Sequence, residues 1–250
     1  MPKISVILPT YNERENIKDL ITAILENSPN PTEIIVVDDN SPDETWKIVE
    51  KIERQKKNVK LVRRFNEKGL ALALADGIAL SNGEILIWMD CDFSHPPKLI
   101  PQLLKTLENC DISVASRYVE GGGMRYSFTR IFTSRILNFF ANIVLGFSIK
   151  DYTSGYPAVK RKVLEKVKIS PLLGESRSYI SAYGEYFISF LYRAKKKGFK
   201  ITEIPYIYVP RKKGKSKTAP TIITLLKRGI VYSSAIIYLR LKYSKTTIKL

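Results

Sequence analysis

Five short apolar, β-branched runs in the first 116 residues alternate with amphipathic stretches, and this alternation restricts the fold more than any other feature. The runs cover residues 4–8, 33–37, 59–62, 84–89 and 111–115, and they lack the polar alternation of a half-exposed strand. Strands of this kind are covered on both faces. Helical patterns lie between them at residues 13–26, 43–57, 69–79 and 97–108. The repetition predicts βαβ units in an α/β fold with a parallel sheet.

Polar residues gather where these predicted strands end. They are residues 9–13 after the first run, Asp38 and Asp39 after the second, 90–92 after the fourth, and 116–117 after the fifth. In an open parallel sheet, ligands bind beyond the carboxyl ends of the strands. We therefore expect one site at this edge of the sheet.

Asp90 and Asp92 are separated by one residue, so strand alternation points both side chains to the same side. Two carboxylates this close repel each other and raise each other's pKa unless a cation neutralises them. Magnesium or manganese, which keep several waters and bridge substrate phosphates, are the usual cations in such a place. The alternative is that both acids are solvated at the start of a loop.

Asp38 and Asp39 permit two interpretations. A carboxylate at the end of a strand can accept hydrogen bonds from a ribose or a base N–H group, and it can equally cap the following helix. That helix is predicted to begin at Ser41, because Pro42 occupies the first helical position and Glu44 completes a capping box.

Tyr11 lies in the turn after the first strand, where an aromatic ring can stack on a base. The sequence contains no Gly-x-Gly-x-x-Gly or Walker pattern, which argues against a conventional dinucleotide or P-loop site. His95 is the only histidine, and its position before Pro96 favours a structural cap. Without a second histidine or clustered cysteines, the sequence argues against zinc chemistry.

The positive charge of the chain is concentrated in its last part. Residues 193–250 hold 16 Lys and Arg against one acid, whereas residues 1–192 hold 25 against 23, and the formal net charge of the whole chain is +17. Such charge is typical of nucleic-acid-binding proteins or of a charge-rich thermophile surface. Here long apolar stretches separate the cations, which favours binding to an anionic membrane surface.

Two helical candidates, residues 125–149 and 221–241, are predicted to lie in a membrane interface without crossing it. Their longest uncharged runs have 14 and 11 residues, short of the roughly 20 that span a bilayer. In the first candidate one polar stripe recurs every four residues, at Arg130, Ser134, Asn138 and Asn142. With only two cysteines, Cys91 and Cys110, and no leader-like N-terminus, we expect a reducing, cytoplasmic setting.

Several motifs together resemble a known family. In chain order they are Pro9-Thr10-Tyr11-Asn12-Glu13 with Asn16, Asp38-Asp39-Asn40-Ser41-Pro42-Asp43, Asn66-Glu67-Lys68-Gly69-Leu70 with Ala73 and Gly77, Met89-Asp90-Cys91-Asp92-Phe93-Ser94-His95-Pro96-Pro97, Ser116-Arg117-Tyr118, Arg130 with Ser134 and Asn138, Ser154-Gly155-Tyr156, and the basic loop 211–217. Over residues 3–217 the chain is similar to the inverting, metal-dependent family 2 glycosyltransferases of GT-A fold, and within them to the dolichol-phosphate mannose synthase group.

The resemblance implies a Rossmann-like GT-A domain over residues 1–217, with a mixed, mainly parallel sheet flanked by helices. Residues 1–116 would form its nucleotide-sugar half and residues 117–217 its acceptor half. The basic, amphipathic tail, residues 218–250, would associate with a membrane.

The resemblance also implies roles for individual residues. The nucleotide sugar would be held by Pro9, Tyr11, Glu13, Asp38, Asp39 and Asp90, with Arg211 and Lys217 closing over its phosphates. Mg²⁺ or Mn²⁺ would be bound by Asp90 and Asp92, with Ser94 or water at the position where the family pattern has Gln. The acceptor phosphate would be gripped by Arg117, Arg130 and Ser134. Asp90, Asp92 and Arg117 would form the catalytic centre without a general base, because a phosphate acceptor is already ionised.

The implied reaction moves a sugar, mannose from GDP-mannose or another sugar from a UDP donor, to dolichyl or polyprenyl phosphate. The enzyme would be a peripheral protein on the cytoplasmic face of the membrane, with no nucleic-acid partner. The alternative within glycosyl transfer is an acceptor with a sugar or polysaccharide hydroxyl. That chemistry needs a positioned carboxylate base, for which Glu185 and Asp151 are the candidates.

Overall fold

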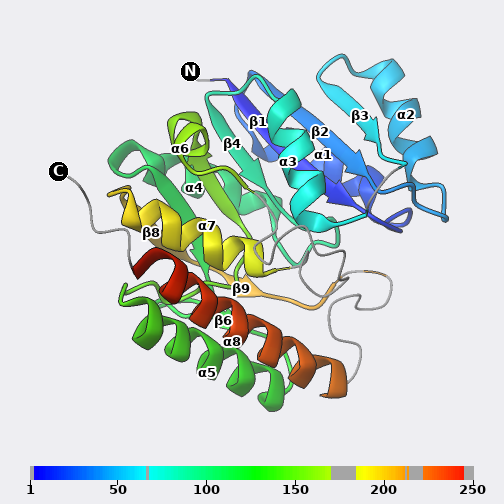
Figure 1. Cartoon of the computed structure of the whole chain (residues 1–250). Coiled ribbons are helices and arrows are strands. Elements are labelled where there is room, and N and C mark those ends of the chain that lie inside the picture. The colour runs from blue at the N-terminus through cyan, green and yellow to red at the C-terminus, as the bar shows by residue number, and fades with distance from the viewer. Residues whose placement is uncertain (1–2, 66–67, 170–183, 212, 214–221, 245–250) are drawn as a thin grey trace.

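A seven-stranded sheet lies between two layers of helices in the computed structural model, which describes residues 3–65, 68–169, 184–211, 213 and 222–244 (Figure 1). The strands are β1 (Ile4–Thr10), β2 (Thr32–Asp38), β3 (Val59–Arg63), β4 (Ile85–Trp88), β5 (Ile112–Ser116), β7 (Pro157–Lys160) and β8 (Ile201–Pro205). Their order is β3-β2-β1-β4-β7-β5-β8. Only β7 runs antiparallel to its neighbours in this sheet. The predicted mixed, mainly parallel sheet is therefore confirmed.

The helices cover both faces of the sheet, as expected for strands without polar alternation. One face carries α1 (Ile17–Asn27), α2 (Thr45–Gln55) and α4 (Ile100–Thr106), with short 3₁₀ turns at Pro97–Leu99 and Leu107–Asn109. The other carries α3 (Leu70–Leu80), α6 (Arg161–Lys166) and α7 (Glu185–Lys196). Alternation along β1 divides the two cores, because Val6 and Leu8 join the first and Ile7 joins the second.

Two close packing contacts hold the second face together. Gly77 brings α3 against β1, since a Cβ atom there would lie only 2.5 Å from Cγ2 of Ile7. Trp88, at the end of β4, is buried edge-on against Phe187 and Phe190 of α7, with ring centroids 6.4 and 5.6 Å apart. Removing so large a buried ring typically costs about 3–5 kcal/mol of stability.

Two long helices, α5 (Phe128–Leu145) and α8 (Ile222–Ser244), lie side by side, and α8 also contacts α7 (Figure 1). Ala235, Ile236 and Leu239 of α8 are buried in the same core as α7. Of the predicted tail, residues 218–250, the described part is α8, which is thus packed against the rest of the molecule. No helix within the described ranges combines the length and the hydropathy that crossing a bilayer requires.

Strands from the predicted acceptor half also belong to the main sheet, because β7 stands between β4 and β5 and β8 lies at the edge beside β5. A second, two-stranded parallel sheet joins β6 (Gly123–Met124) to β9 (Ile207–Tyr208). This small sheet joins the segment that follows β5 to the segment that follows β8, close to the predicted site.

The helix start predicted at Ser41 is wrong. The helix α2 begins at Thr45, after Glu44 in a left-handed conformation with φ of 60°. Ser41 instead receives a hydrogen bond from the Asn12 backbone N–H (2.9 Å) and donates its hydroxyl to Asp38 (2.6 Å). The residues that follow Ser41 match the sequence pattern of a helix cap. Its hydroxyl is instead engaged in the contact between the loop after β1 and the loop after β2.

Candidate active site

The polar loops meet at the carboxyl edge of the sheet where the strand order reverses. From β1 the chain steps outward through β2 to β3, and then returns to the other side of β1 as β4. Such a reversal leaves a crevice between the loops that follow the two central strands. The loops after β1, β2 and β4 each contain a non-glycine residue in the left-handed region, Asn12 (φ 53°), Asn40 (φ 51°) and Phe93 (φ 67°). Strained backbone of this kind clusters at functional sites.

Glu13, Asp92 and Arg211 form an ion cluster in this crevice. Nη2 of Arg211 lies 2.6 Å from Oε1 of Glu13 and 3.2 Å from Oδ2 of Asp92. The other carboxylate oxygen of Glu13 accepts a hydrogen bond from Nδ2 of Asn16 at 2.9 Å. The structure thus brings together the predicted residues Glu13, Asp92 and Arg211, which lie far apart in the sequence.

Asp90 faces the same cluster with its outer side open to solvent. Surrounding protein raises the pKa of the Asp90 carboxyl, and the negative charges of Asp92 and Glu13 raise it further against the opposing effect of His95 and Arg211. An excess of carboxylates in one place is the condition that a divalent cation relieves. Asp90 and Asp92 are therefore suited to provide the carboxylate ligands of a magnesium or manganese ion.

The geometry also limits what the protein alone contributes to such a site. Among the described residues, no group of three or more His, Cys, Asp or Glu side chains is arranged to hold a metal ion. Ser94 is completely buried, and its backbone N–H donates to Oδ1 of Asp92 at 3.0 Å. Two carboxylates with the remaining positions left for substrate phosphates and water is the usual arrangement for Mg²⁺.

His95 holds the metal-motif loop in shape. Its Nδ1 accepts the Asp90 backbone N–H at 3.0 Å, so the proton sits on Nε2, which lies 3.1 Å from the Ser154 carbonyl oxygen. The buried ring also stacks on Tyr156, with centroids 4.9 Å apart. These contacts make His95 a structural residue that joins the loop after β4 to the segment before β7.

The residues predicted to hold the nucleoside differ in how exposed they are. Tyr11 is partly exposed, and the Lys68 ammonium lies 4.5 Å from its ring centroid. Asp39 accepts the Gly69 backbone N–H at 2.8 Å and forms an ion pair with Arg64. Burial raises the pKa of the Asp39 carboxyl, while Gly69 and Arg64 act to lower it. Pro9 lies near the end of β1, within the pairing of β1 with β2.

Asp38 is the least exposed of these residues. It is completely buried, and its two oxygens accept the Ser41 backbone N–H (2.8 Å) and the Ser41 hydroxyl (2.6 Å). Burial raises its pKa, and the bonds from Ser41 partly offset this effect. Of the two interpretations of Asp38, these contacts favour loop structure over contact with a ribose. Lys217 lies outside the described residues.

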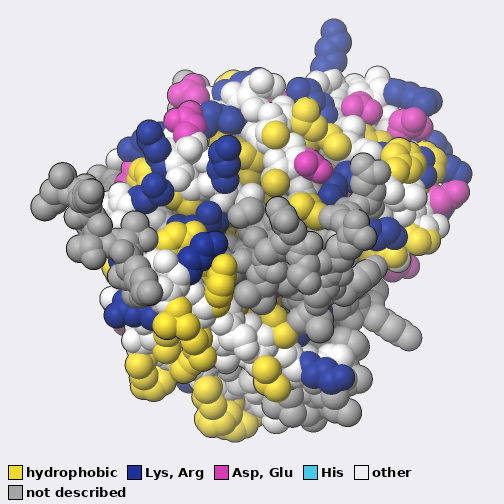
Figure 2. All heavy atoms as spheres, viewed as in Figure 1, with side chains coloured by type: hydrophobic (Ala, Val, Ile, Leu, Met, Phe, Trp, Pro, Cys, Tyr) yellow, Lys and Arg dark blue, Asp and Glu magenta, His cyan; other side chains and the backbone are white. Residues whose placement is uncertain are grey.

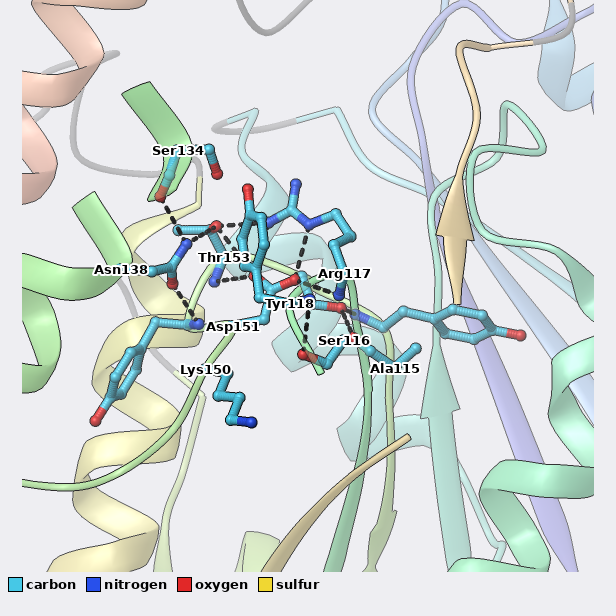
Figure 3. A network of polar contacts seen from close by, with 12 residues as sticks. Ala115, Ser116, Arg117, Tyr118, Ser134, Asn138, Lys150, Asp151 and Thr153 are labelled. Atoms are coloured by element: carbon cyan, nitrogen blue, oxygen red, sulfur yellow. Dashed lines mark hydrogen bonds and ion pairs between the residues drawn. The ribbon is translucent and has the colours of Figure 1, made fainter. Parts of the chain in front are cut away.

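Arg117 follows β5 and is held by Asp151 (Figure 3). Nε and Nη2 of Arg117 lie 2.7 Å from the two carboxylate oxygens, and Nη2 also donates to the Thr153 hydroxyl at 2.7 Å. Burial lowers the pKa of the Arg117 guanidinium, but the ion pair with Asp151 outweighs this and raises it above its ordinary value. Arg117 is therefore a permanently charged, oriented group.

The other two predicted acceptor residues, Arg130 and Ser134, lie in the first two turns of α5. The Arg130 guanidinium packs 4.8 Å from the Tyr126 ring centroid. The Ser134 hydroxyl is close enough to Tyr118 to lower its pKa against the raising effect of burial, and Tyr118 also contacts Arg117 at 5.3 Å. The structure thus brings Ser134 and Arg117 to one tyrosine.

Tyr208, which sequence reasoning missed, lies between Arg117 and the residues around Asp90 and Asp92. The Tyr208 ring, in β9, lies 5.7 Å from the Arg117 guanidinium and 5.7 Å from the Tyr126 ring. Burial, and then the charges of Asp90 and Asp92, raise the pKa of Tyr208. Its only sequence signal is its position just before the basic loop 211–217, which does not distinguish it from other tyrosines.

Large apolar side chains are exposed on α5 and α8, beside exposed basic residues such as Arg135 and Lys227. They are Phe128, Phe132, Ile136, Phe139 and Ile143 of α5 together with Ile230, Ile237 and Leu241 of α8, and we call this set the apolar face. Figure 2 shows hydrophobic side chains gathered over these helices at the bottom of the view. The five α5 residues fall within about 80° around the helix axis, at 100° per residue. An exposed apolar surface of this extent marks an interaction site.

The polar stripe of α5 points the other way. Asn138 is buried and accepts the Tyr152 backbone N–H at 2.7 Å. One turn later, Asn142 exchanges two hydrogen bonds with the backbone of Ile149, at 2.7 and 3.0 Å. The helix therefore buries Asn138 together with apolar residues such as Ala141 and Leu145, and it leaves five large apolar side chains exposed.

Comparison with known proteins fits this geometry. The family model Glycosyl transferase family 2 matches residues 5–168. The chain belongs to glycosyl transferase family 2. A dolichol-phosphate mannosyltransferase of Pyrococcus furiosus is 37% identical over 221 residues, which make up 86% of this chain and 59% of that protein. The chain thus spans about three fifths of the length of this relative.

A second relative is similar over more of its own length. The polyprenol monophosphomannose synthase of Mycolicibacterium smegmatis is 34% identical over 218 residues, 85% of this chain and 79% of that protein. The predicted resemblance to this family is therefore confirmed.

Solved structures of low sequence identity share the fold. Glucosyl-3-phosphoglycerate synthase from Mycobacterium tuberculosis, in complex with Mn²⁺, UDP and glucosyl-3-phosphoglycerate, superimposes with a TM-score of 0.68 at 20% identity, covering 95% of this chain and 80% of that one. The same protein in complex with Mg²⁺ and UDP gives a TM-score of 0.67 at 19% identity, covering 95% and 79%. These matches support the predicted GT-A fold.

Proposed function

We propose that the protein transfers a sugar from a nucleotide diphosphate sugar to a polyprenyl phosphate at a membrane surface. Mannose from GDP-mannose is the first choice, because both curated relatives are named for mannose transfer to a polyprenol or dolichol phosphate. Glucose or another sugar from a UDP donor is the second choice, since Asp39 and Tyr11 offer contacts that either base can use.

One observation carries this proposal: the two sides of α5 suit the two parts of a lipid phosphate. It bears Ser134, which shares Tyr118 with the Arg117 guanidinium, and Arg130 one turn earlier. Its outer side bears the apolar face. A polyprenyl phosphate has the same division, with a dianionic head that guanidinium groups bind well and a long apolar chain. A free sugar acceptor would give the apolar face no role.

The carboxylates of the crevice would hold the donor. Asp90 and Asp92 would bind Mg²⁺ or Mn²⁺, which would supply charge neutralisation to the donor diphosphate. Arg211, now paired with Glu13 and Asp92, lies where its guanidinium would exchange a carboxylate for a phosphate oxygen. Tyr11 and Asp39 would bind the nucleoside.

The reaction would be a single in-line displacement. An oxygen of the acceptor phosphate forms a bond to the anomeric carbon while the bond from that carbon to the diphosphate oxygen breaks, which inverts the anomeric configuration. Arg117 and Arg130 orient the nucleophile, and Arg211 stabilises the departing nucleoside diphosphate. Catalysis then depends on positioning and charge stabilisation.

The candidate bases for a hydroxyl acceptor are both enclosed. Asp151 is completely buried, and both its oxygens are bonded to Arg117. Glu185 is completely buried in the first turn of α7. A general base must reach the proton that it removes, so neither residue serves a sugar hydroxyl in this arrangement. This supports the phosphate acceptor over the alternative.

Charge supports a peripheral association with the cytoplasmic membrane face. α5 and α8 contain six basic residues and no acid, and basic residues near anionic headgroups contribute about 1 kcal/mol each. A nucleic-acid partner is not part of the proposal, because the cations flank an apolar surface.

A donor screen tests the proposal. The protein is incubated with Mg²⁺ or Mn²⁺, a polyprenyl phosphate and a panel of GDP- and UDP-sugars, and release of GDP or UDP is followed with transfer of label to the lipid. Acceptor-dependent release with a chelator-sensitive rate is the expected result. Transfer to a neutral glycoside, with none to the lipid phosphate, would refute it.

A further inference from the structure

A network of hydrogen bonds links the end of β5 to the inner side of α5 (Figure 3). Besides the two side-chain bonds from Arg117, Asp151 accepts the Arg117 backbone N–H at 2.9 Å. The carboxylate thus fixes both the backbone and the side chain of this arginine. Within the described part of the chain, no acceptor engages the remaining terminal nitrogen, Nη1, which carries two N–H groups.

Thr153 extends the network to α5. Its hydroxyl oxygen accepts from Nη2 of Arg117 (2.7 Å) and from Nδ2 of Asn138 (3.3 Å), and it donates to Oδ1 of Asp151 (3.3 Å). A hydroxyl has one proton and two lone pairs, so all of its hydrogen-bonding capacity is used. Asn138 in turn lies one turn after Ser134 on α5 and accepts the Tyr152 N–H.

The other side of the same segment is tied to the sheet. Glu203 of β8 accepts the backbone N–H groups of Lys150 (2.8 Å) and Asp151 (2.9 Å) through its two oxygens. The segment that holds Arg117 is therefore fixed between β8 and α5. Any shift of α5 relative to the sheet would have to break bonds to Thr153 or to Tyr152.

We propose that Asp151 and Thr153 are positioning residues for the acceptor phosphate. They aim the free end of Arg117 and, through Asn138, set its distance from Arg130 and Ser134. This inference rests on the proposed function, because it assigns the acceptor-binding role to those three side chains. A preoriented guanidinium loses little side-chain entropy on binding a phosphate, which is the advantage that the network provides.

A purely electrostatic role for Asp151 makes the opposite prediction. Its negative charge neutralises Arg117, so removing that charge alone would strengthen the attraction for a phosphate. If Asp151 positions Arg117, removing its charge weakens acceptor binding instead. Asp151→Asn keeps the shape of the side chain and separates these outcomes by the sign of the change.

The test measures steady-state kinetics with geranyl phosphate, a short polyprenyl phosphate that does not require a membrane, and with the donor that the wild-type protein uses. Thr153→Val removes the hydroxyl but keeps the Arg117–Asp151 pair, so it remains informative where Asp151→Asn fails to fold. Thr153→Ser restores the hydroxyl. Thr106→Val, at an exposed threonine bonded within α4, is the matched control.

We expect Asp151→Asn and Thr153→Val to raise the KM for geranyl phosphate about tenfold, the effect of losing one bond to a charged group. The KM for the donor should not change, and Thr153→Ser and Thr106→Val should behave like the wild type. A lower acceptor KM in Asp151→Asn, or equal changes in both KM values in Thr153→Val, would overturn the inference. Wild-type protein without any transfer to lipid phosphate would instead refute the proposed function.

Discussion

Phe139→Ser provides the sharpest test of membrane docking through the apolar face. Phe139 is 68% exposed at the middle of α5, so its replacement leaves no cavity in the protein core. Because the side chain meets mainly solvent, any loss of function on membranes reflects contacts made outside the molecule.

The magnitude follows from the exposed area. A phenylalanine side chain buries about 200 Å² when fully covered, so an exposure of 68% leaves about 130 Å² to be covered by lipid. At about 25 cal/mol per Å² this gives about 3 kcal/mol for complete insertion. An interfacial helix inserts only one side, so we expect partitioning to anionic vesicles to fall about 10- to 100-fold.

Phe65→Ser is the matched control, because Phe65 is 69% exposed but lies after β3, at the far end of the sheet from α5. Flotation with vesicles of phosphatidylglycerol and phosphatidylcholine measures the partition coefficient of both variants. Circular dichroism and the melting temperature check that each remains folded. Equal losses in the two variants, or no loss in Phe139→Ser, would refute docking through this face.

Three further predictions concern the crevice and the stability of the fold. Asp92→Ala should lower kcat at least about 100-fold and abolish Mn²⁺ binding seen by calorimetry, because it removes half of the carboxylate pair; unchanged turnover would contradict the metal assignment. Arg130→Ala should raise the KM for polyprenyl phosphate about tenfold with an unchanged donor KM; an equal effect on the donor would argue against an acceptor role. Burial raises the pKa of Glu33, but bonds from Ser5 and Asn82 and nearby lysines lower it overall below its ordinary value. Its contribution to stability is therefore complete above that value and lost as the pH falls through the folded-state pKa, so Glu33→Gln should lower the melting temperature at pH 7 and flatten its decline in acid.

The fold was largely predictable, because strands that are buried on both faces of a sheet appear in the sequence as continuous apolar runs. The five apolar runs of the first half became β1 to β5, and the helical patterns between them became α1 to α4. The helix beginning at Thr45 shows the limit of local signals. The predicted cap, Ser41, is used by Asn12 of another loop, and a contact across 29 residues leaves no periodic pattern.

The candidate site was predictable where residue type and chemistry coincide. The negative charges of Asp92 and Glu13 raise the pKa of Asp90, and Arg211, which is distant in the sequence, forms ion pairs with Glu13 and Asp92. Tyr208 was not predictable, since its role depends on the neighbours that β9 gives it. Asp151 was predicted only as a candidate base for a hydroxyl acceptor, and its contacts were not predictable, because only the structure shows both oxygens bonded to Arg117.

The polar stripe of α5 does not face solvent as it would on an ordinary surface helix, and five large apolar side chains of this helix are exposed instead. A polar stripe on an apolar helix normally marks the solvent side, yet here Asn138 and Asn142 are used to bind the 149–152 segment. Burying amides is costly unless their hydrogen bonds are made, and these bonds are made. The apolar side is then left outside, where water disfavours it and lipid does not. Thr153, which is bonded to both Asn138 and Arg117, connects this helix to the arginine, so a helix held in this way would align the phosphate of the proposed lipid acceptor with the apolar face.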